Sequence, residues 1–212
     1  MTIDQSVYLD AMGIQTWQLK SSSQPPTVKT DWHALKTTIQ ACTRCALHKT
    51  RTQTVFGVGN PQAKLMLIGE APGFYEDQKG EPFVGRAGQL LNAMLEAIGY
   101  SRSEVYIANI LKCRPPNNRD PLPEEVQQCT PFLQQQIAFI QPQLLVALGR
   151  ISAQYLLDTK TSLGQLRNRI HTYGPSQIPL LVTYHPAYLL RTPKDKAKAY
   201  QDFITATKHL MQ

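Results

Sequence analysis

The segment LMLIGEAPG, residues 65–73, constrains the fold more than any other stretch of the chain. Its four consecutive apolar residues are followed at once by the turn formers Gly69, Pro72 and Gly73, a pattern typical of a strand buried on both faces that ends in a tight loop. Open α/β sheets bind ligands at the carboxyl ends of such strands. We therefore expect Glu70 at the mouth of a pocket; the alternative is an ordinary strand-to-loop turn with a solvated glutamate.

Strand-like and helix-like segments alternate along the rest of the chain. Apolar runs predict further strands at residues 105–109, 144–149 and 178–183. Spacing and capping signals predict helices from Asp31 towards Cys42, at 86–98, at 123–140, after Gly149 through Leu156, and at 194–210. This alternation predicts a three-layer α/β/α fold around a central four-stranded parallel sheet. Residues 1–30 are interpreted as a flexible N-terminal appendage and linker, and residues 31–212 as one domain.

The charge balance favours a polyanionic partner. The 212 residues include 22 Lys and Arg against 15 Asp and Glu, a formal charge of +7. No apolar run is long enough to cross a membrane, and residues 1–20 have no basic leader-like start. We expect a cytosolic protein, and in that reducing compartment cysteines bind metal or do chemistry more often than they form disulfides.

The four cysteines suggest a metal centre. Cys42 and Cys45 form a C-x₂-C pair, and Cys113 and Cys129 complete a set with none left over. Structural zinc sites tend to use two close pairs, whereas the wide spacing of the second pair favours a [4Fe–4S] cluster held by four thiolates. Zinc remains an alternative, and a further alternative is that the four cysteines are unrelated buried thiols.

Polar residues follow three of the four predicted strands, namely Glu70, Asn109 and His185. In a parallel sheet all three emerge at the same edge, so one crevice would collect an acid, an amide and an imidazole. Taken alone, His185 is more often a structural histidine at a strand end. The convergence of the three is what indicates a site.

Several motifs, in order from about Asp31 to the C-terminus, carry a family resemblance. They are GEAPG at 69–73 with Glu76-Asp77, PFVGRAG at 82–88, YIANI at 106–110 with CRPP at 113–116, and HPAYLLR at 185–191. Together with the four cysteines, they resemble the family 4 uracil-DNA glycosylases, the iron–sulfur branch of their superfamily. The resemblance implies hydrolysis of the N-glycosidic bond of uracil in DNA, in base excision repair. Residues 1–30 lie outside it.

The resemblance also implies roles around a flipped-out base. Asn109 would read the edge of uracil, donating to O4 and accepting from N3–H, which cytosine cannot match. Phe83 would stack on the base. His185 would donate to O2 as negative charge develops there, and Glu76 would exclude the methyl group of thymine.

Activation of the attacking water is left open by the resemblance. The best-known uracil glycosylases carry an aspartate directly after the position of Glu70, and here that residue is Ala71, which lines the base site by analogy. Glu70 could help the water, or the reaction could pass through a cation-like sugar that needs little base assistance.

For contacts with DNA, the resemblance points to the segment after His185. Leu189 would wedge into the duplex, helped by Tyr188 and Leu190, and Arg191 would contact phosphate. Arg86 and Arg114 are weaker candidates for phosphate contacts. Phe74 and Tyr75 stand where the resemblance leads one to expect an acidic pair.

Other functional classes remain as alternatives. One is a non-enzymatic nucleic-acid-binding module with an iron–sulfur or zinc centre, and another is a glycosylase for other deaminated bases. A dinucleotide- or nucleotide-binding protein is disfavoured, because neither G-x-G-x-x-G nor G-x-x-x-x-G-K-[ST] is present. The expected partner is uracil-containing DNA, single- or double-stranded, and nothing in the sequence requires more than a monomer.

Overall fold

The computed structural model describes residue 12 and residues 31–211, so the appendage predicted over residues 1–30 lies, apart from Met12, outside the described residues. The helices are α2 (Trp32–Gln40), α3 (Phe74–Lys79), α4 (Arg86–Glu96), α5 (Pro123–Ile140), α6 (Arg150–Leu156), α7 (Leu163–Leu166), α8 (Pro186–Arg191) and α9 (Lys196–Leu210). Short 3₁₀ turns are η1 (Ala46–Lys49), η2 (Pro116–Asn118) and η3 (Pro193–Asp195). The strands are β1 (Val58–Gly59), β2 (Leu65–Gly69), β3 (Tyr106–Asn109), β4 (Leu144–Leu148), β5 (Ile170–Tyr173) and β6 (Ile178–Thr183).

The strands form one mixed sheet in the order β1-β3-β2-β4-β6-β5. Its centre, β3-β2-β4-β6, is parallel, and these are the four predicted strands. The predicted central four-stranded parallel sheet is therefore confirmed, and β1 and β5 add an antiparallel strand at each edge. Neither edge strand has the continuous apolar run of a doubly covered strand: β1 has two residues, and β5 alternates exposed and half-buried positions.

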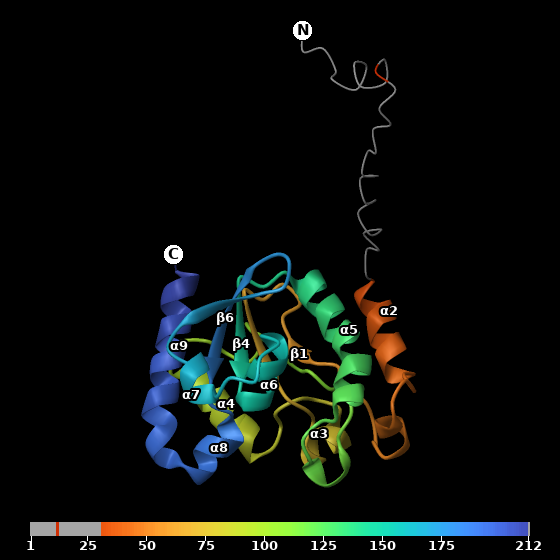
Figure 1. Cartoon of the computed structure of the whole chain (residues 1–212). Helices are drawn as coiled ribbons and strands as arrows, with labels where there is room; N and C mark the ends of the chain where they lie inside the picture. The colour runs from red at the N-terminus through yellow and green to blue at the C-terminus, as the bar shows by residue number, and fades with distance from the viewer. Residues whose placement is uncertain (1–11, 13–30, 212) are drawn as a thin grey trace.

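Helices cover both faces of the sheet, as the sequence predicts (Figure 1). Met66 and Ile68 of β2 belong to the core under α2, α5 and α6, whereas Leu65 and Leu67 belong to the core under α4 and α9. This alternation follows from the two-residue period of a strand. Because both faces are covered, every residue of β2, β3 and β4 is buried.

The parallel register brings the predicted polar residues to one edge. Gly69 at the end of β2 pairs with Asn109 at the end of β3, and Leu148 pairs with Thr183 at the end of β6. In Figure 1, α8 at the lower left and α3 at the lower right both lie towards this carboxyl edge. Among helices in the described residues, none combines the length and apolar character needed to span a membrane.

Candidate active site

Asn109 is the most unusual polar group at this edge. Its side chain is buried, and its Oδ1 is the one buried side-chain nitrogen or oxygen without a hydrogen-bond partner among the described residues. Gly69 makes room for it, because a Cβ there would lie 2.4 Å from Oδ1 of Asn109 and 2.7 Å from Cζ of Phe83. An unpaired buried acceptor is costly, so Asn109 is positioned to accept a hydrogen bond from a ligand.

The ring of Phe83 forms a wall beside the amide. Phe83 is buried and has a left-handed backbone, with φ of 54°. Arg102 holds this conformation by donating to the carbonyl oxygens of Pro82 and Phe83. Gly88 is required as well, because a Cβ there would lie 1.7 Å from the Phe83 carbonyl oxygen. The loop therefore holds the Phe83 ring beside Asn109, where the ring also packs on the core under α4 and α9.

His185 faces the same ring, with ring centroids 5.6 Å apart and planes tilted by 33°. It caps the N-terminus of α8, where its Nδ1 accepts a hydrogen bond from the Ala187 N–H at 3.1 Å. Burial, with a smaller effect of the nearby Arg191 charge, lowers the pKa of His185 to about 4. The imidazole is therefore neutral near pH 7, and because Nδ1 is an acceptor, its single proton is on Nε2.

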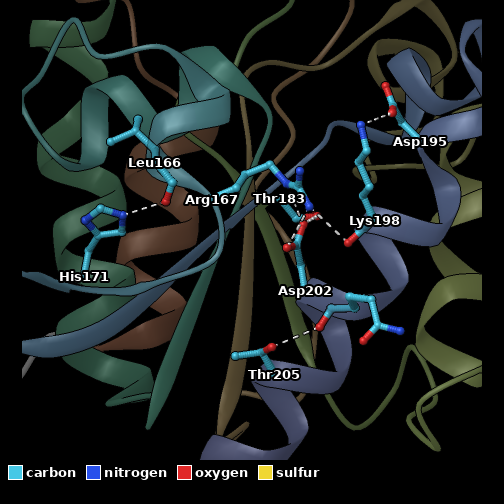
Figure 2. A network of polar contacts seen from close by, with 9 residues as sticks. Leu166, Arg167, His171, Thr183, Asp195, Lys198, Asp202 and Thr205 are labelled. Atoms are coloured by element: carbon cyan, nitrogen blue, oxygen red, sulfur yellow. Dashed lines mark hydrogen bonds and ion pairs between the residues drawn. The ribbon is translucent and has the colours of Figure 1, made fainter.

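A buried ion pair anchors the strand that carries His185 (Figure 2). Arg167 donates to both carboxylate oxygens of Asp202, at 2.8 and 2.9 Å, and Thr183 donates to Asp202 at 2.6 Å. The Arg167 guanidinium also lies 4.2 Å from the ring centroid of Tyr184, the residue before His185. These contacts fix the end of β6 and so the direction in which the imidazole points.

Glu70 lies directly after β2 and is half-buried. Burial raises the pKa of Glu70 to about 7, with a further rise from Asp120 and an opposing effect of Arg150. A carboxyl group with a pKa near neutrality can exchange a proton with water in the working range of an enzyme. Ala71, the next residue, is half-buried and packs on the core, so it offers no second carboxylate.

Glu76 closes the loop around Phe83. Its Oε1 accepts from the N–H groups of Val84 and Gly85, at 2.9 and 3.0 Å. The next residue, Asp77, is buried and accepts from the Thr52 N–H with both oxygens at 3.0 Å. The Glu76-Asp77 pair thus joins α3 to two neighbouring segments, a positioning role that the sequence interpretation did not include.

The four cysteines line one cavity, together with side chains that include Arg44, His48 and Phe132. Arg51 Nη1 lies 3.0 Å from Cys113 Sγ, and the Lys112 N–H donates to Cys129 Sγ at 3.2 Å. Burial raises the pKa of Cys113, and it raises that of Cys129 to about 11. Within residues 31–211, no three His, Cys, Asp or Glu side chains are arranged to hold a single metal ion.

Lys112 lies between the cysteines and the strand-end pocket. Its ammonium group is fully buried and donates to the Asn109 carbonyl oxygen at 2.7 Å and to Gln136 Oε1 at 2.6 Å. Gln136 in turn donates to the Phe56 carbonyl oxygen at 2.8 Å. Burial lowers the pKa of Lys112 to about 8, against the opposing effect of the Cys129 and Cys113 thiols.

Comparison with known proteins places this arrangement in a family. The model of the uracil DNA glycosylase superfamily matches residues 56–208. The chain is 46% identical over 172 residues to the type-4 uracil-DNA glycosylase of Archaeoglobus fulgidus, covering 78% of this chain and 86% of that protein. The chain belongs to the type-4 uracil-DNA glycosylase family. The Thermotoga maritima member is 44% identical over 162 residues, covering 76% of this chain and 83% of its own. A type-5 uracil-DNA glycosylase from Thermus thermophilus is 31% identical over 147 residues, covering 61% and 67%.

The structure buries one of the residues that the resemblance to family 4 assigns to DNA contact. Leu189, which is expected to wedge into the duplex, has a completely buried side chain beside Leu90, Met94 and Phe203. The segment is helix α8 and not a loop, so its apolar positions divide between an inner and an outer face. Leu190 remains partly exposed, and Arg191 is exposed at the end of α8. Tyr188 is held by a 2.7 Å hydrogen bond from its hydroxyl to Asp195.

The structure of this family 4 chain also contains positioning residues that sequence reasoning missed. They are Arg102, Lys112, Arg167 and Asp202. Their partners lie far away in sequence, as with Arg167 and Asp202, which are 35 residues apart. No local pattern marks such pairs. The one available signal was the basic residue before Cys113, and its burial could not be read from the sequence.

Proposed function

We propose that this chain excises uracil from DNA by hydrolysing the N-glycosidic bond, leaving an abasic site, and that it acts as a monomer. The observation that carries the proposal is the unpaired, buried Oδ1 of Asn109 beside the rings of Phe83 and His185. All of these groups come from one chain, which supports the monomer. Family membership supports the same activity.

Recognition of uracil follows from the side-chain amide of Asn109. With the uracil flipped into the pocket, Asn109 Oδ1 accepts from N3–H and Nδ2 donates to O4. Cytosine lacks the N3–H and presents an amino donor in place of O4, so it leaves the buried Oδ1 unpaired. That mismatch penalises cytosine strongly, because a buried polar group without a partner costs about 1–3 kcal/mol. Phe83 stacks on the base, and Glu76, which holds the loop beside it, restricts space for a 5-methyl group.

Bond cleavage depends on His185. As the C1′–N1 bond breaks, its electron pair moves onto the base, and negative charge collects at O2. The neutral imidazole donates its Nε2–H to O2 and stabilises that charge without giving up the proton. A water then bonds to C1′ from the opposite side and loses a proton. Glu70 in its ionised form accepts that proton, or stabilises the cation-like sugar by its charge.

Contacts with DNA involve α8 and neighbouring arginines. We propose that Leu190, partly exposed on α8, fills the space left by the flipped base, in place of the buried Leu189. The exposed Arg191, next in the chain, contacts a phosphate on the strand that carries the uracil. Arg86 and Arg114 provide further cations near the pocket.

We further infer that Cys42, Cys45, Cys113 and Cys129 hold a [4Fe–4S] cluster. The four cysteines line one cavity, and four thiolates are the usual ligand set of a [4Fe–4S] cluster. Arg51 and the Lys112 N–H, which contact two of the sulfurs, would stabilise thiolates. Hydrolysis moves no electrons, so the role supported here is structural: the cluster ties α2, the Cys113 loop and α5 together.

The test is uracil release from an oligonucleotide with one deoxyuridine, in excess EDTA, with alkali cleavage to reveal abasic sites. A thymine-containing strand is the control. Alkali-labile cleavage at uracil alone, lost in His185→Ala, supports the proposal. A folded, DNA-binding protein that releases no base would instead support the alternative of a non-enzymatic binding module. Cleavage at hypoxanthine or xanthine but not uracil would support a glycosylase for other deaminated bases.

A further inference from the structure

Two neighbouring aromatic side chains at the start of α3 are exposed to solvent. Phe74 is 50% exposed and Tyr75 is 62% exposed, and their rings meet edge to face with centroids 5.5 Å apart. Single exposed apolar residues are ordinary on protein surfaces, but an adjacent aromatic pair at the rim of a binding site is not. Neither ring belongs to the two hydrophobic cores.

The pair lies beside the loop that carries Phe83. A Cβ on Gly85 would lie 3.3 Å from Cδ2 of Tyr75, so the Tyr75 ring rests against the loop that presents Phe83. Glu76, the next residue on α3, bonds to the N–H groups of that loop. Any DNA strand that delivers a base to Phe83 and Asn109 therefore passes close to Tyr75.

Cations flank the aromatic pair. The Arg114 guanidinium lies 5.1 Å from the ring centroid of Phe74, and Arg86 is exposed at the first position of α4, directly after Gly85. In residues 31–211, neither arginine forms an ion pair with a carboxylate. Aromatic faces alternating with unneutralised arginines are what proteins use to bind single-stranded nucleic acid, since bases stack on the rings and phosphates meet the cations.

We propose that Phe74 and Tyr75 form a stacking platform for an unpaired base adjacent to the flipped uracil. In a duplex the neighbouring bases stack on each other and their faces are not available, so the platform acts on single strands and on unpaired or frayed sites. It therefore biases the protein towards uracil in single-stranded DNA. This inference rests on the proposed function, because the platform matters for catalysis only if the pocket takes a base.

The test compares Phe74→Ala/Tyr75→Ala with the unmodified full chain. Affinity is measured for a short single strand without uracil and for the matching duplex, and uracil release is measured on both forms of a uracil-containing substrate. Loss of one stacked base costs about 1–3 kcal/mol, so single-strand affinity should fall about tenfold or more. Duplex affinity should fall by less than about threefold.

Three controls make the result specific. Phe139→Ala removes a ring of similar exposure, 40%, from the far end of α5, and should leave single-strand affinity unchanged. Tyr75→Phe keeps the ring and should bind like the unmodified chain. Leu122→Ala, at another exposed apolar position, should have no effect.

Equal losses of affinity for single-stranded and duplex DNA, or no loss of affinity for either, would contradict the proposed stacking platform. The binding measurement uses DNA without uracil, so it does not depend on excision. If the unmodified chain released no uracil while the aromatic variant still lost single-strand affinity, the proposed function would fail and the platform would stand. If uracil release were normal and single-strand affinity unchanged in the variant, the platform would fail and the function would stand.

Discussion

The strand-end pocket and the cysteine cavity lie near each other but are built differently. The pocket is formed on the ends of buried parallel strands, and its residues are fixed from behind, as Asp202 and Arg167 fix the strand before His185. The cysteine cavity is assembled from a segment after α2, the loop after β3, and α5, which the sheet does not hold in register. The pocket is therefore preformed by the fold, whereas the cluster proposed above would join the three segments of the cavity.

Lys112 connects the two regions. It donates to the backbone of Asn109 on one side, and its own backbone N–H donates to Cys129 on the other. A buried ammonium is costly unless it is well paired. The placement of this charge indicates that Asn109, which we propose reads uracil, and the cysteine cavity share one structural element. The predictions below separate the contributions of the two regions.

Replacing His185 should give the largest effect on catalysis with little effect on folding. His185→Ala removes a preorganised donor to O2, and the single-turnover rate of uracil release should fall about 100- to 1000-fold. The melting temperature should stay close to that of the unmodified chain, because the Arg167–Asp202 pair still holds the strand end. Thermal unfolding of the same preparation checks this. A large drop in stability would mean that the pocket is not preformed.

Replacing a cysteine should give the opposite result. Cys129→Ser should lower the iron content and the melting temperature, by roughly 6–12 °C if the lost link costs about 3 kcal/mol. Iron analysis and visible absorption measure loading, and thermal unfolding measures stability. The matched variant Ser152→Ala removes a buried hydroxyl near β2 and should leave iron loading intact. Stoichiometric zinc in a colourless preparation would contradict the cluster.

Replacing Lys112 should affect both regions, each less strongly than the replacement of His185 or Cys129 does. Lys112→Met removes donors to Asn109 and Gln136, and hydrogen bonds from a charged group are worth about 1.5–3 kcal/mol. We expect kcat/KM for uracil release to fall roughly 10- to 100-fold, mainly through KM, and the melting temperature to fall as well. The exposed Lys64 offers a control, since Lys64→Met should change neither. A normal KM with reduced iron loading would show that Lys112 serves the cysteine cavity alone.

The comparison also explains which features the sequence could predict. Continuous apolar runs identified the strands, and their ends located Glu70, Asn109 and His185, because a parallel sheet imposes that convergence. The number and spacing of the cysteines predicted that the four thiols belong to one site. The buried state of Leu189 was missed because the helical period of α8, and not its apolar composition, decides which residue points inward. Arg102 and Asp202 were missed because their partners are set by tertiary packing.

The smallest expected effect concerns Glu70 and separates it from His185 by pH. A carboxyl group with a pKa of about 7 is mostly protonated and neutral below that pH and mostly ionised above it. If the ionised form assists the water or the cation-like sugar, the single-turnover rate should rise about tenfold from about pH 6 to about pH 8 and then level off. His185, with a pKa of about 4, is neutral throughout this range and contributes no change.

Glu70→Gln tests this assignment, because the amide does not titrate. The variant should be slower above pH 7, and its rate should be flat across the range in which the unmodified chain accelerates. Arg150→Gln offers a finer test: Arg150 lowers the pKa of Glu70, so its removal should shift the rise to higher pH without changing the plateau. A rise that persists in Glu70→Gln would assign the titration to another group and leave the sugar cation to form without help from this carboxylate.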